Sequence, residues 1–232
     1  GGSGRGVVPN VGGEPTKVVA VADGFVASST ITSADDAIAL VKVGVLGSVP
    51  LGFGLAGRAS TSIGTDRESG TSCAMGPGGV LYLAGDYDTK EALTRGRAAV
   101  VRATAAGALD ATWANAGKLV VDFAEPLVAR DGFTYARDVL VDASGRAVFV
   151  GEIEDKLLSG ANRNRAVVAR YTSNGTPDPL FGTGGKLAFA NAQSTLLVRR
   201  AAFQPDGKLV VVGMSSATGN PFVARVVMST TL

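Results

Sequence analysis

The chain has 232 residues, of which 46% are apolar and 18% charged, and its net charge is +2. This balance supplies enough apolar side chains for a buried core, and it offers no basic surface of the kind that nucleic acids or anionic membranes require. There is no histidine and only one cysteine, Cys73, so the sequence excludes His-based catalytic triads, His-ligated metals and intrachain disulfides. No apolar run approaches the ~18 residues that span a bilayer. We therefore expect no transmembrane segment, no cofactor and no metal site.

In chain order, the first predicted element is a short strand over residues 4–11, opened by Gly4-Arg5. A glycine followed by a basic residue opens a similar short strand at three later points: Gly57-Arg58, Gly117-Lys118 and Gly185-Lys186. The chain therefore begins inside a repeat, just before what is elsewhere a fourth strand.

The first full repeat is predicted to start with a hairpin around Asp23-Gly24, preceded by the apolar strand Lys17–Val21. Asp-Gly pairs accept the positive φ angles that tight turns between strands require. A variable polar loop leads to a third strand that carries Lys42. A connector from Gly47 through Phe53 to Gly57 then leads to a fourth strand.

The same order of elements recurs in the rest of the chain at a spacing of about 60 residues, which is typical of propellers and solenoids. The turns are Gly78-Gly79, Ser144-Gly145 and Asp206-Gly207; the basic residues of the third strands are Arg102, Arg170 and Arg225; the connector aromatics are Trp113 and Phe181. Four short strands per repeat make one propeller blade. The sequence predicts an all-β fold, a β-propeller of four four-stranded blades in one domain, with repeats at 15–63, 69–123, 135–190, and 197–232 plus 4–11.

The last repeat stops after its third strand, and the strand at residues 4–11 is the one that it lacks. Pairing of the two would close a ring and leave no open sheet edge, which removes an aggregation liability. An alternative is that the chain forms part of a larger propeller.

The repeat resembles the delta-60 repeat family of bacterial β-propellers over nearly the whole chain. Three segments match the family pattern closely: Gln204-Pro205-Asp206-Gly207-Lys208, Ala169-Arg170-Tyr171 and the connector Asn174–Lys186. The first repeat departs most, with Pro50 where Asp110 and Asp178 stand. The resemblance implies the fold and a bacterial, exported setting, either extracellular or in the cell envelope, with a lipid anchor as one possibility. It implies no catalytic residues.

The basic residues of the third strands are predicted to be structural, because a side chain repeated in every blade usually satisfies a group repeated in every blade. Asp110 and Asp178 on the connectors are the expected partners of Arg102 and Arg170. Pro50 leaves Lys42 without such a partner.

The loops between second and third strands, which are predicted over residues 85–97 and 151–165 in the second and third repeats, are expected to form a working face, because they differ most between repeats. The candidate binding residues on this face, together with those of one loop between fourth and first strands, are Asp86, Asp88, Arg95, Arg97, Glu152, Glu154, Asp155, Arg163, Arg165, Asp66, Arg67 and Glu68. The alternative is that they are solvated charges on tolerant loops.

A second candidate site lies where the first strands begin, because the innermost strand of a blade lines the central channel. Lys17, Arg137 and Arg199 take this place in three blades, and Thr71 in the fourth. Converging cations favour an anion or an acidic side chain of a partner.

The function expected from these features is a non-catalytic binding or scaffold module of a bacterial exported or cell-surface protein, with a protein or glycan partner. One alternative is a hydrolase or lyase that acts through loop carboxylates. Against it, glycoside hydrolysis needs two carboxyls on opposite sides of a bond, whereas Glu152, Glu154 and Asp155 share one loop. Another alternative is a structural subunit of a filament or surface layer.

Overall fold

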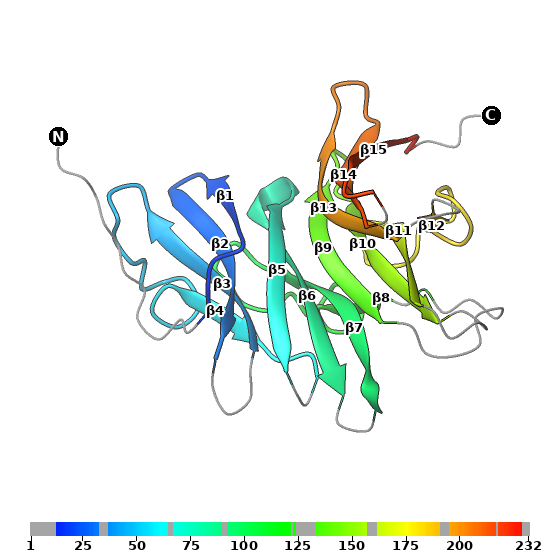
Figure 1. The fold of residues 1–232 in the computed structure, drawn as a ribbon. Helices are drawn as coiled ribbons and strands as arrows, with labels where there is room; N and C mark the ends of the chain where they lie inside the picture. Colours follow the sequence, from blue (N-terminus) through cyan, green and yellow to red (C-terminus); the bar gives the residue numbers. More distant parts are fainter. Residues whose placement is uncertain are drawn as a thin grey trace.

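The computed structural model describes residues 13–32, 37–64, 67–89, 92–121, 123, 133–156, 162–190, 195–216 and 218–228. Four antiparallel sheets follow one another along the chain and stand in an arc (Figure 1). Three of them have four strands, and the fourth has three among the described residues. The predicted all-β propeller of four blades is confirmed. The strand predicted over residues 4–11 lies outside the described residues.

The strands of each sheet, here called blades 1 to 4, pair in the order in which they occur in the chain. Blade 1 consists of β1 (Lys17–Val21), β2 (Gly24–Ile31), β3 (Ala37–Gly44) and β4 (Arg58–Thr61). Blade 2 consists of β5 (Glu68–Met75), β6 (Leu81–Thr89), β7 (Ala92–Ala103) and β8 (Lys118–Val121), with a short 3-10 turn, η1 (Pro77–Gly79), between its first two strands. Blade 3 consists of β9 (Thr134–Val141), β10 (Ala147–Lys156), β11 (Asn162–Tyr171) and β12 (Lys186–Phe189). Blade 4 consists of β13 (Leu196–Phe203), β14 (Leu209–Ser215) and β15 (Pro221–Val226).

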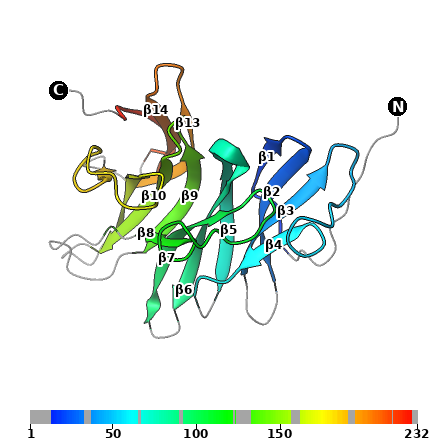
Figure 2. The ribbon, with the colours of Figure 1, turned by 180° about the vertical axis from the view of Figure 1, so that it is seen from behind.

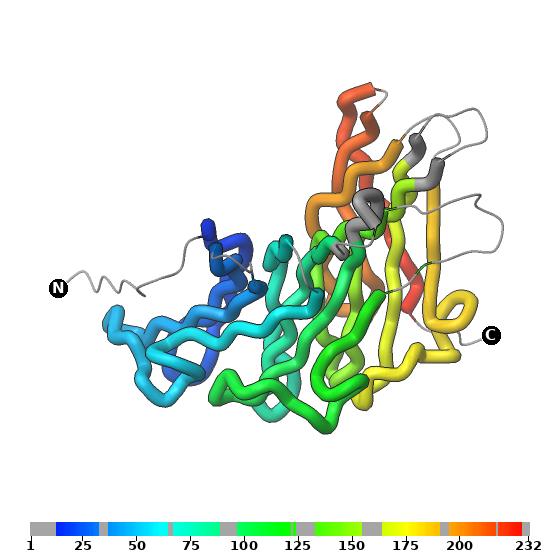
Figure 3. The backbone as a smooth tube through the Cα atoms, turned by 90° about the horizontal axis from the view of Figure 1, so that it is seen from below, coloured from blue at the N-terminus to red at the C-terminus, as the bar shows by residue number. Residues whose placement is uncertain are grey.

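The first strands of the blades lie together at the centre of the arc, where β5 packs against β1 and β9, and β9 packs against β13. The later strands of each blade fan outward, as the views from behind and from below show (Figures 2 and 3). No helix among the described residues is long and apolar enough to cross a membrane.

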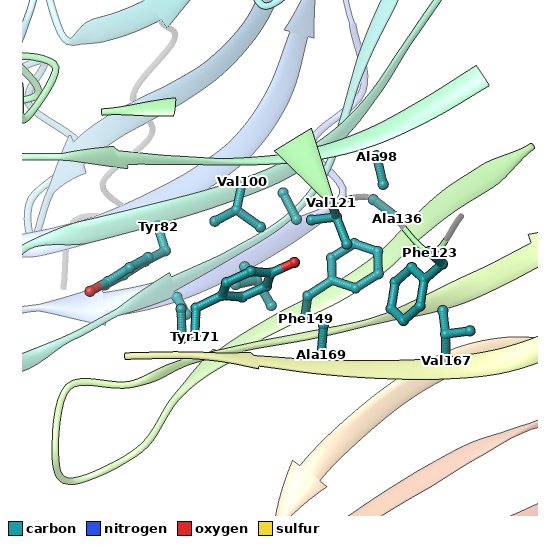
Figure 4. Packing of buried hydrophobic residues seen from close by; sticks show 14 of the residues in the cluster. Tyr82, Ala98, Val100, Val121, Phe123, Ala136, Phe149, Val167, Ala169 and Tyr171 are labelled. Atoms are coloured by element: carbon teal, nitrogen blue, oxygen red, sulfur yellow. The ribbon is translucent and has the colours of Figure 1, made fainter. Parts of the chain in front are cut away.

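Three apolar clusters hold the blades together, one at each junction between neighbours along the chain. The cluster between blades 2 and 3 shows how they form: Val100 of β7 and Phe149 of β10 project from facing sheets into one layer (Figure 4). Alternation along a strand sends successive side chains to opposite faces, so each blade contributes to the junction before it and to the junction after it. No such cluster joins blade 4 to blade 1 in the described part of the chain.

The connectors bear out the structural role predicted for the basic residues of the third strands. Arg102 forms an ion pair with Asp110 at 2.7 Å, and its guanidinium lies 5.7 Å from the ring of Trp113. Arg170 pairs with Asp178 at 2.8 Å and lies 5.1 Å from the ring of Phe181. Each arginine thus joins its strand to a buried connector aromatic.

In the other two blades, the basic residue of the third strand pairs with an acid of the hairpin turn instead. Lys42 pairs with Asp23 of its own hairpin turn at 2.7 Å, because Pro50 offers it no carboxylate. Arg225 likewise pairs with Asp206 of its hairpin turn, at 2.6 Å.

The prediction that residues 85–97 and 151–165 are loops was wrong for most of their length. β6 continues to Thr89 and β7 begins at Ala92, and β10 continues to Lys156 with β11 beginning at Asn162. The backbone ladder of the hairpin extends beyond the sheet core and turns these segments into paired strands.

Candidate binding site at the loop face

The first strands of blades 2, 3 and 4 each contain a β-bulge near the axis of the propeller. The pairing with the second strand skips one residue in each: Thr71, Arg137 and Arg199. A bulge leaves one residue unpaired and re-aims side chains. We call these three residues the bulge position.

The residue after the bulge position also corresponds from blade to blade. In each blade, one residue of the second strand pairs with the basic residue of the third strand. The second-strand residue two positions further along the chain pairs with the residue after the bulge position. We call this place on the first strand the axis position. In blades 1 to 4 it is occupied by Lys17, Ser72, Asp138 and Arg200. The sequence grouping of Lys17 with Arg137 and Arg199 was therefore wrong by one residue, because the residue that matches the bulge position in blade 1 is Thr16.

Asp138 is the centre of the axis position. Its carboxylate is fully buried and accepts hydrogen bonds from Lys17 Nζ at 2.5 Å and from Ser72 Oγ at 2.6 Å. It also accepts the backbone N–H groups of Val139 and Ala201, each at 3.0 Å. A buried carboxylate requires such partners, so Lys17 is committed to Asp138 and is not a free cation.

Arg137 has a comparable acid partner. Its Nε and Nη2 donate to the two carboxylate oxygens of Glu152 at 3.1 and 3.3 Å, and its guanidinium lies 5.2 Å from the ring of Tyr135. Glu152 is itself fully buried and also accepts from Asn164 Nδ2 at 3.2 Å. Burial, followed by the negative charge of Glu154, raises the pKa of Tyr135 to about 12.

Two other candidate acids of the loop face also accept hydrogen bonds from backbone. Asp86 accepts the N–H of Ala136, and burial raises its pKa to about 7. Glu68 is buried at the start of β5 and accepts the N–H groups of Ile63 and Gly64 at 2.5 and 2.6 Å. These groups are inside the fold and do not project from loops, contrary to expectation.

The bulges explain why these acids are needed at the junctions. The N–H of the residue before each bulge position turns toward the preceding blade, where one side chain accepts it. The donors are Gly70, Ala136 and Val198, and the acceptors are Thr30 Oγ1, Asp86 and Glu152, which occupy equivalent places on the second strands. We call each of these hydrogen bonds a junction staple. The bulge is the signal that sequence reasoning missed.

The two cations of β13 at this face form no ion pair among the described residues. Arg200 Nη1 donates to the carbonyl oxygens of Arg137 and Arg199 at 3.3 and 3.0 Å, and its Nη2 donates to the carbonyl of Thr16 at 3.0 Å. One nitrogen therefore bridges the backbone carbonyls of the two bulge-position arginines. The Arg199 side chain is exposed and forms no ion pair within the described ranges.

The other predicted residues of the loop face are only partly described. Asp88 lies on β6 and Arg97 on β7, while Glu154 lies on β10 and Arg165 on β11. Arg67 is exposed before β5, and its carbonyl accepts the N–H of Asp88 at 2.9 Å. Asp66 and the side chains of Arg95, Asp155 and Arg163 lie outside the described residues. Within the described part of the chain, no group of three or more acids, cysteines or histidines is placed to hold a metal ion.

A sequence family described as "Domain of unknown function (DUF5122) beta-propeller" matches residues 156–181, from the end of β10 to the connector aromatic Phe181. The fold is a β-propeller. The match covers the third strand and most of the connector of blade 3, and the delta-60 identification remains a prediction.

None of the curated proteins matches the sequence significantly. Among solved structures, the chain is similar to a protein of unknown function from Bacteroides caccae, with 12% identity and a TM-score of 0.45, over 93% of this chain and 61% of that one. It is also similar to a GH43 endo-arabinanase from Bacillus licheniformis (11% identity, TM-score 0.45, 92% of this chain and 73% of that one). A third similar structure is the mannose phosphorylase MPT-4 from Leishmania mexicana (8% identity, TM-score 0.47, 92% of this chain and 66% of that one). The chain thus spans less than two thirds of the length of the Bacteroides protein.

Proposed function

We propose that this propeller is a non-catalytic binding module that takes a carboxylate group of a protein or glycan partner at the axis of its loop face. Arg199 is the main contact, and Arg137 beside it is the second. The observation that carries the proposal is the exposed Arg199, which has no ion pair among the described residues and whose main-chain carbonyl is bridged to that of Arg137 by Arg200.

The balance of charge at the axis supports an anionic ligand. The cations there are Lys17, Arg137, Arg199 and Arg200, and the paired acids are Asp138 and Glu152. Asp86 also interacts with Arg137, but burial raises its pKa to about 7 and so reduces its negative charge at neutral pH. The four cations therefore outnumber the three acids. A concave or crowded site with one sign of charge attracts a ligand of the opposite sign.

The geometry of Arg137 leaves it one free edge. Glu152 accepts hydrogen bonds from Nε and Nη2 of Arg137, and the Arg137 side chain is 30% exposed. A guanidinium presents five donors in a fixed fork, so Arg137 can donate from the remaining edge while Arg199 binds the same carboxylate from the other side. Two arginines around one carboxylate give a charge-assisted, directional contact.

The test measures binding of two fluorescein-labelled probes, a hexa-aspartate peptide and an oligogalacturonate, by fluorescence anisotropy at low salt. We expect Arg199→Ala to weaken binding about tenfold, equivalent to ~1.4 kcal/mol. The matched control is Lys208→Ala, which removes a cation from a hairpin turn at the opposite end of the strands and should leave the affinity unchanged. The probe that binds tells a peptide partner from a glycan partner. Equal affinities of the wild type and Arg199→Ala, or no binding of either probe, would refute the proposal.

The setting that we propose is extracellular or in the bacterial cell envelope, because the repeat resembles an exported family. Immunodetection of the protein in periplasmic, outer-membrane and culture fractions of the source cells tests this part separately. Recovery in the cytoplasmic fraction alone would contradict it.

A second candidate function is the hydrolase or lyase that acts through carboxylates of this face. The observation in its favour is Asp86, whose pKa of about 7 leaves it partly protonated at neutral pH while the nearby Glu152 adds negative charge. A general acid needs a pKa near the working pH. Turnover of labelled arabinan or mannoside substrates that Asp86→Asn abolishes would establish this function in place of the first.

A further inference from the structure

The two end blades expose faces that are buried at every other junction of the propeller. On the first strands, the residue after the axis position faces the preceding blade. It is Cys73 in blade 2 and Val139 in blade 3, and both are 0% exposed. The same position in blade 1 is Val18, which is 61% exposed.

The second strands repeat this contrast. On each second strand, one residue pairs with the basic residue of the third strand. The residue just before it is Leu81 in blade 2, Ala147 in blade 3 and Leu209 in blade 4, and all three are buried. In blade 1 it is Phe25, which is 50% exposed. Val18 and Phe25 therefore lie on a junction face that has no sheet of the described residues against it.

Blade 4 has the complementary face, which would meet a following blade. The relevant position on the third strand lies two residues before its basic residue. It is Leu40 in blade 1, Val100 in blade 2 and Val168 in blade 3, and all three are buried. Val223 has this place in blade 4 and is 71% exposed, and its partner Val212 on β14 is 36% exposed. An exposed apolar surface that continues an established interface marks a site for another partner.

The contacts at the axis give the width of the space between these faces. Lys17 on β1 reaches Asp138 on β9, with β5 packed between the two strands. Arg200 on β13 reaches the carbonyl of Thr16, next to β1, in the same manner. Side chains of this length span one intervening strand, so the space takes a single blade.

We propose that a fifth sheet with the alternating apolar pattern of this repeat, supplied by a further copy of the repeat, seats between blade 4 and blade 1. This inference concerns assembly and does not depend on the proposed function. The junction staples indicate the chemistry of that sheet. Met214 stands where Thr30, Asp86 and Glu152 accept a staple, and Pro15 stands where Gly70, Ala136 and Val198 donate one. Neither end face can form a staple, so the fifth sheet is held by apolar packing.

The test adds such a sheet in phase with the repeat. A tandem duplication of residues 171–225 after Arg225 continues the repeat, because Arg225 and Arg170 have the same place in it. The copy supplies the short strand that follows a third strand in the repeat, and three strands of a fifth blade. We expect a rise in Tm on the order of 5 °C, and weaker emission of the apolar dye ANS than with the original chain. The matched control carries lysine at the copies of Leu209 and Val211, and it should show neither change.

Three results would overturn the proposal. The first is a duplication that changes neither Tm nor ANS emission. The second is an intramolecular disulfide between cysteines at Phe25 and Val212 in the original chain carrying Cys73→Ser, since the two end faces would then cover each other. The third is a dimer of the original chain, seen by light scattering, that Val223→Lys dissociates, since a second copy would then be the occupant.

Discussion

Lys17 on β1 forms an ion pair with Asp138 on β9 at 2.5 Å, although the strand β5 of blade 2 lies between them. The pair joins blades 1 and 3 directly, and Ser72 of blade 2 and the N–H of Ala201 of blade 4 bond to the same carboxylate. One buried side chain therefore contacts all four blades.

The first prediction concerns this carboxylate. Asp138→Ala should lower the free energy of unfolding by ~3–5 kcal/mol, because it removes the ion pair of the partly buried Lys17 and the acceptor of Ser72 Oγ and of the Ala201 N–H. Urea denaturation followed by circular dichroism measures the effect. The matched control is Asp206→Ala on an exposed hairpin turn, which should change the stability little. Equal loss in the two variants would show that Asp138 is not a central anchor.

The second prediction concerns the connector aromatic of blade 2. Trp113 is fully buried and meets Tyr82 edge to face, with ring centroids 5.6 Å apart. Trp113→Ala should lower the free energy of unfolding by ~3–5 kcal/mol, as large-to-small core changes do. Leu55→Ala, at an exposed connector position of blade 1, is the control. A melting temperature of Trp113→Ala within error of the wild type would remove Trp113 from the core.

The third prediction restores the missing ion pair in blade 1. A cavity of 340 Å³ lies between blades 1 and 2, and it is lined by Lys42, Asp23 and Ala105 among others. In blade 2, the equivalent Arg102 reaches across to the next blade and donates to the carbonyl of Ser173 at 2.8 Å. Lys42→Arg combined with Pro50→Asp should fill this space and stabilise the fold by about 1 kcal/mol.

The gain in stability of the double variant should exceed the sum of the gains of the two single variants, because the two new side chains contact each other. Thermal denaturation of the wild type, both single variants and the double variant forms the required cycle. Additive effects would show that the arginine and the aspartate do not pair.

The fourth prediction concerns pH. The pKa of Asp86 is raised from 3.8 to about 7 in the folded protein, chiefly by burial, so between these values the folded state binds a proton that the unfolded state has released. The contribution of Asp86 to stability is therefore fully present below about pH 4 and is lost as the pH rises through 7. Asp86→Asn should make the stability less dependent on pH over this range. Asp88→Asn is the control, and a wild-type slope in Asp86→Asn would contradict the raised pKa.

The sequence predicted the blades well because the repeat encodes them redundantly. Each Asp-Gly or related turn, each basic residue of a third strand and each connector aromatic fixes one place in the blade. Arg102 with Asp110 and Arg170 with Asp178 form the predicted ion pairs for this reason.

The candidate site was harder to predict because a bulge reverses the faces to which the following side chains point, and the sequence does not mark where this occurs. Lys17 was matched to Arg137 on the basis of charge, whereas its structural counterpart is Asp138. Glu152 was assigned to a loop of the working face for a related reason. The acid follows a glycine and is separated by one apolar residue from the charged run Glu154-Asp155-Lys156, and nothing in that pattern reveals that the N–H of Val198 in the next blade requires an acceptor.

Cys73, the one cysteine of the chain, lies at the joint between blades 1 and 2, buried in their shared apolar cluster. Burial raises the pKa of its thiol, and thiol reagents attack the thiolate. Covalent labelling of this sulfur must therefore wait until blade 1 swings away from blade 2. The rate at which a thiol reagent modifies the native protein therefore reports how often that one junction opens, and the measurement requires no substitution.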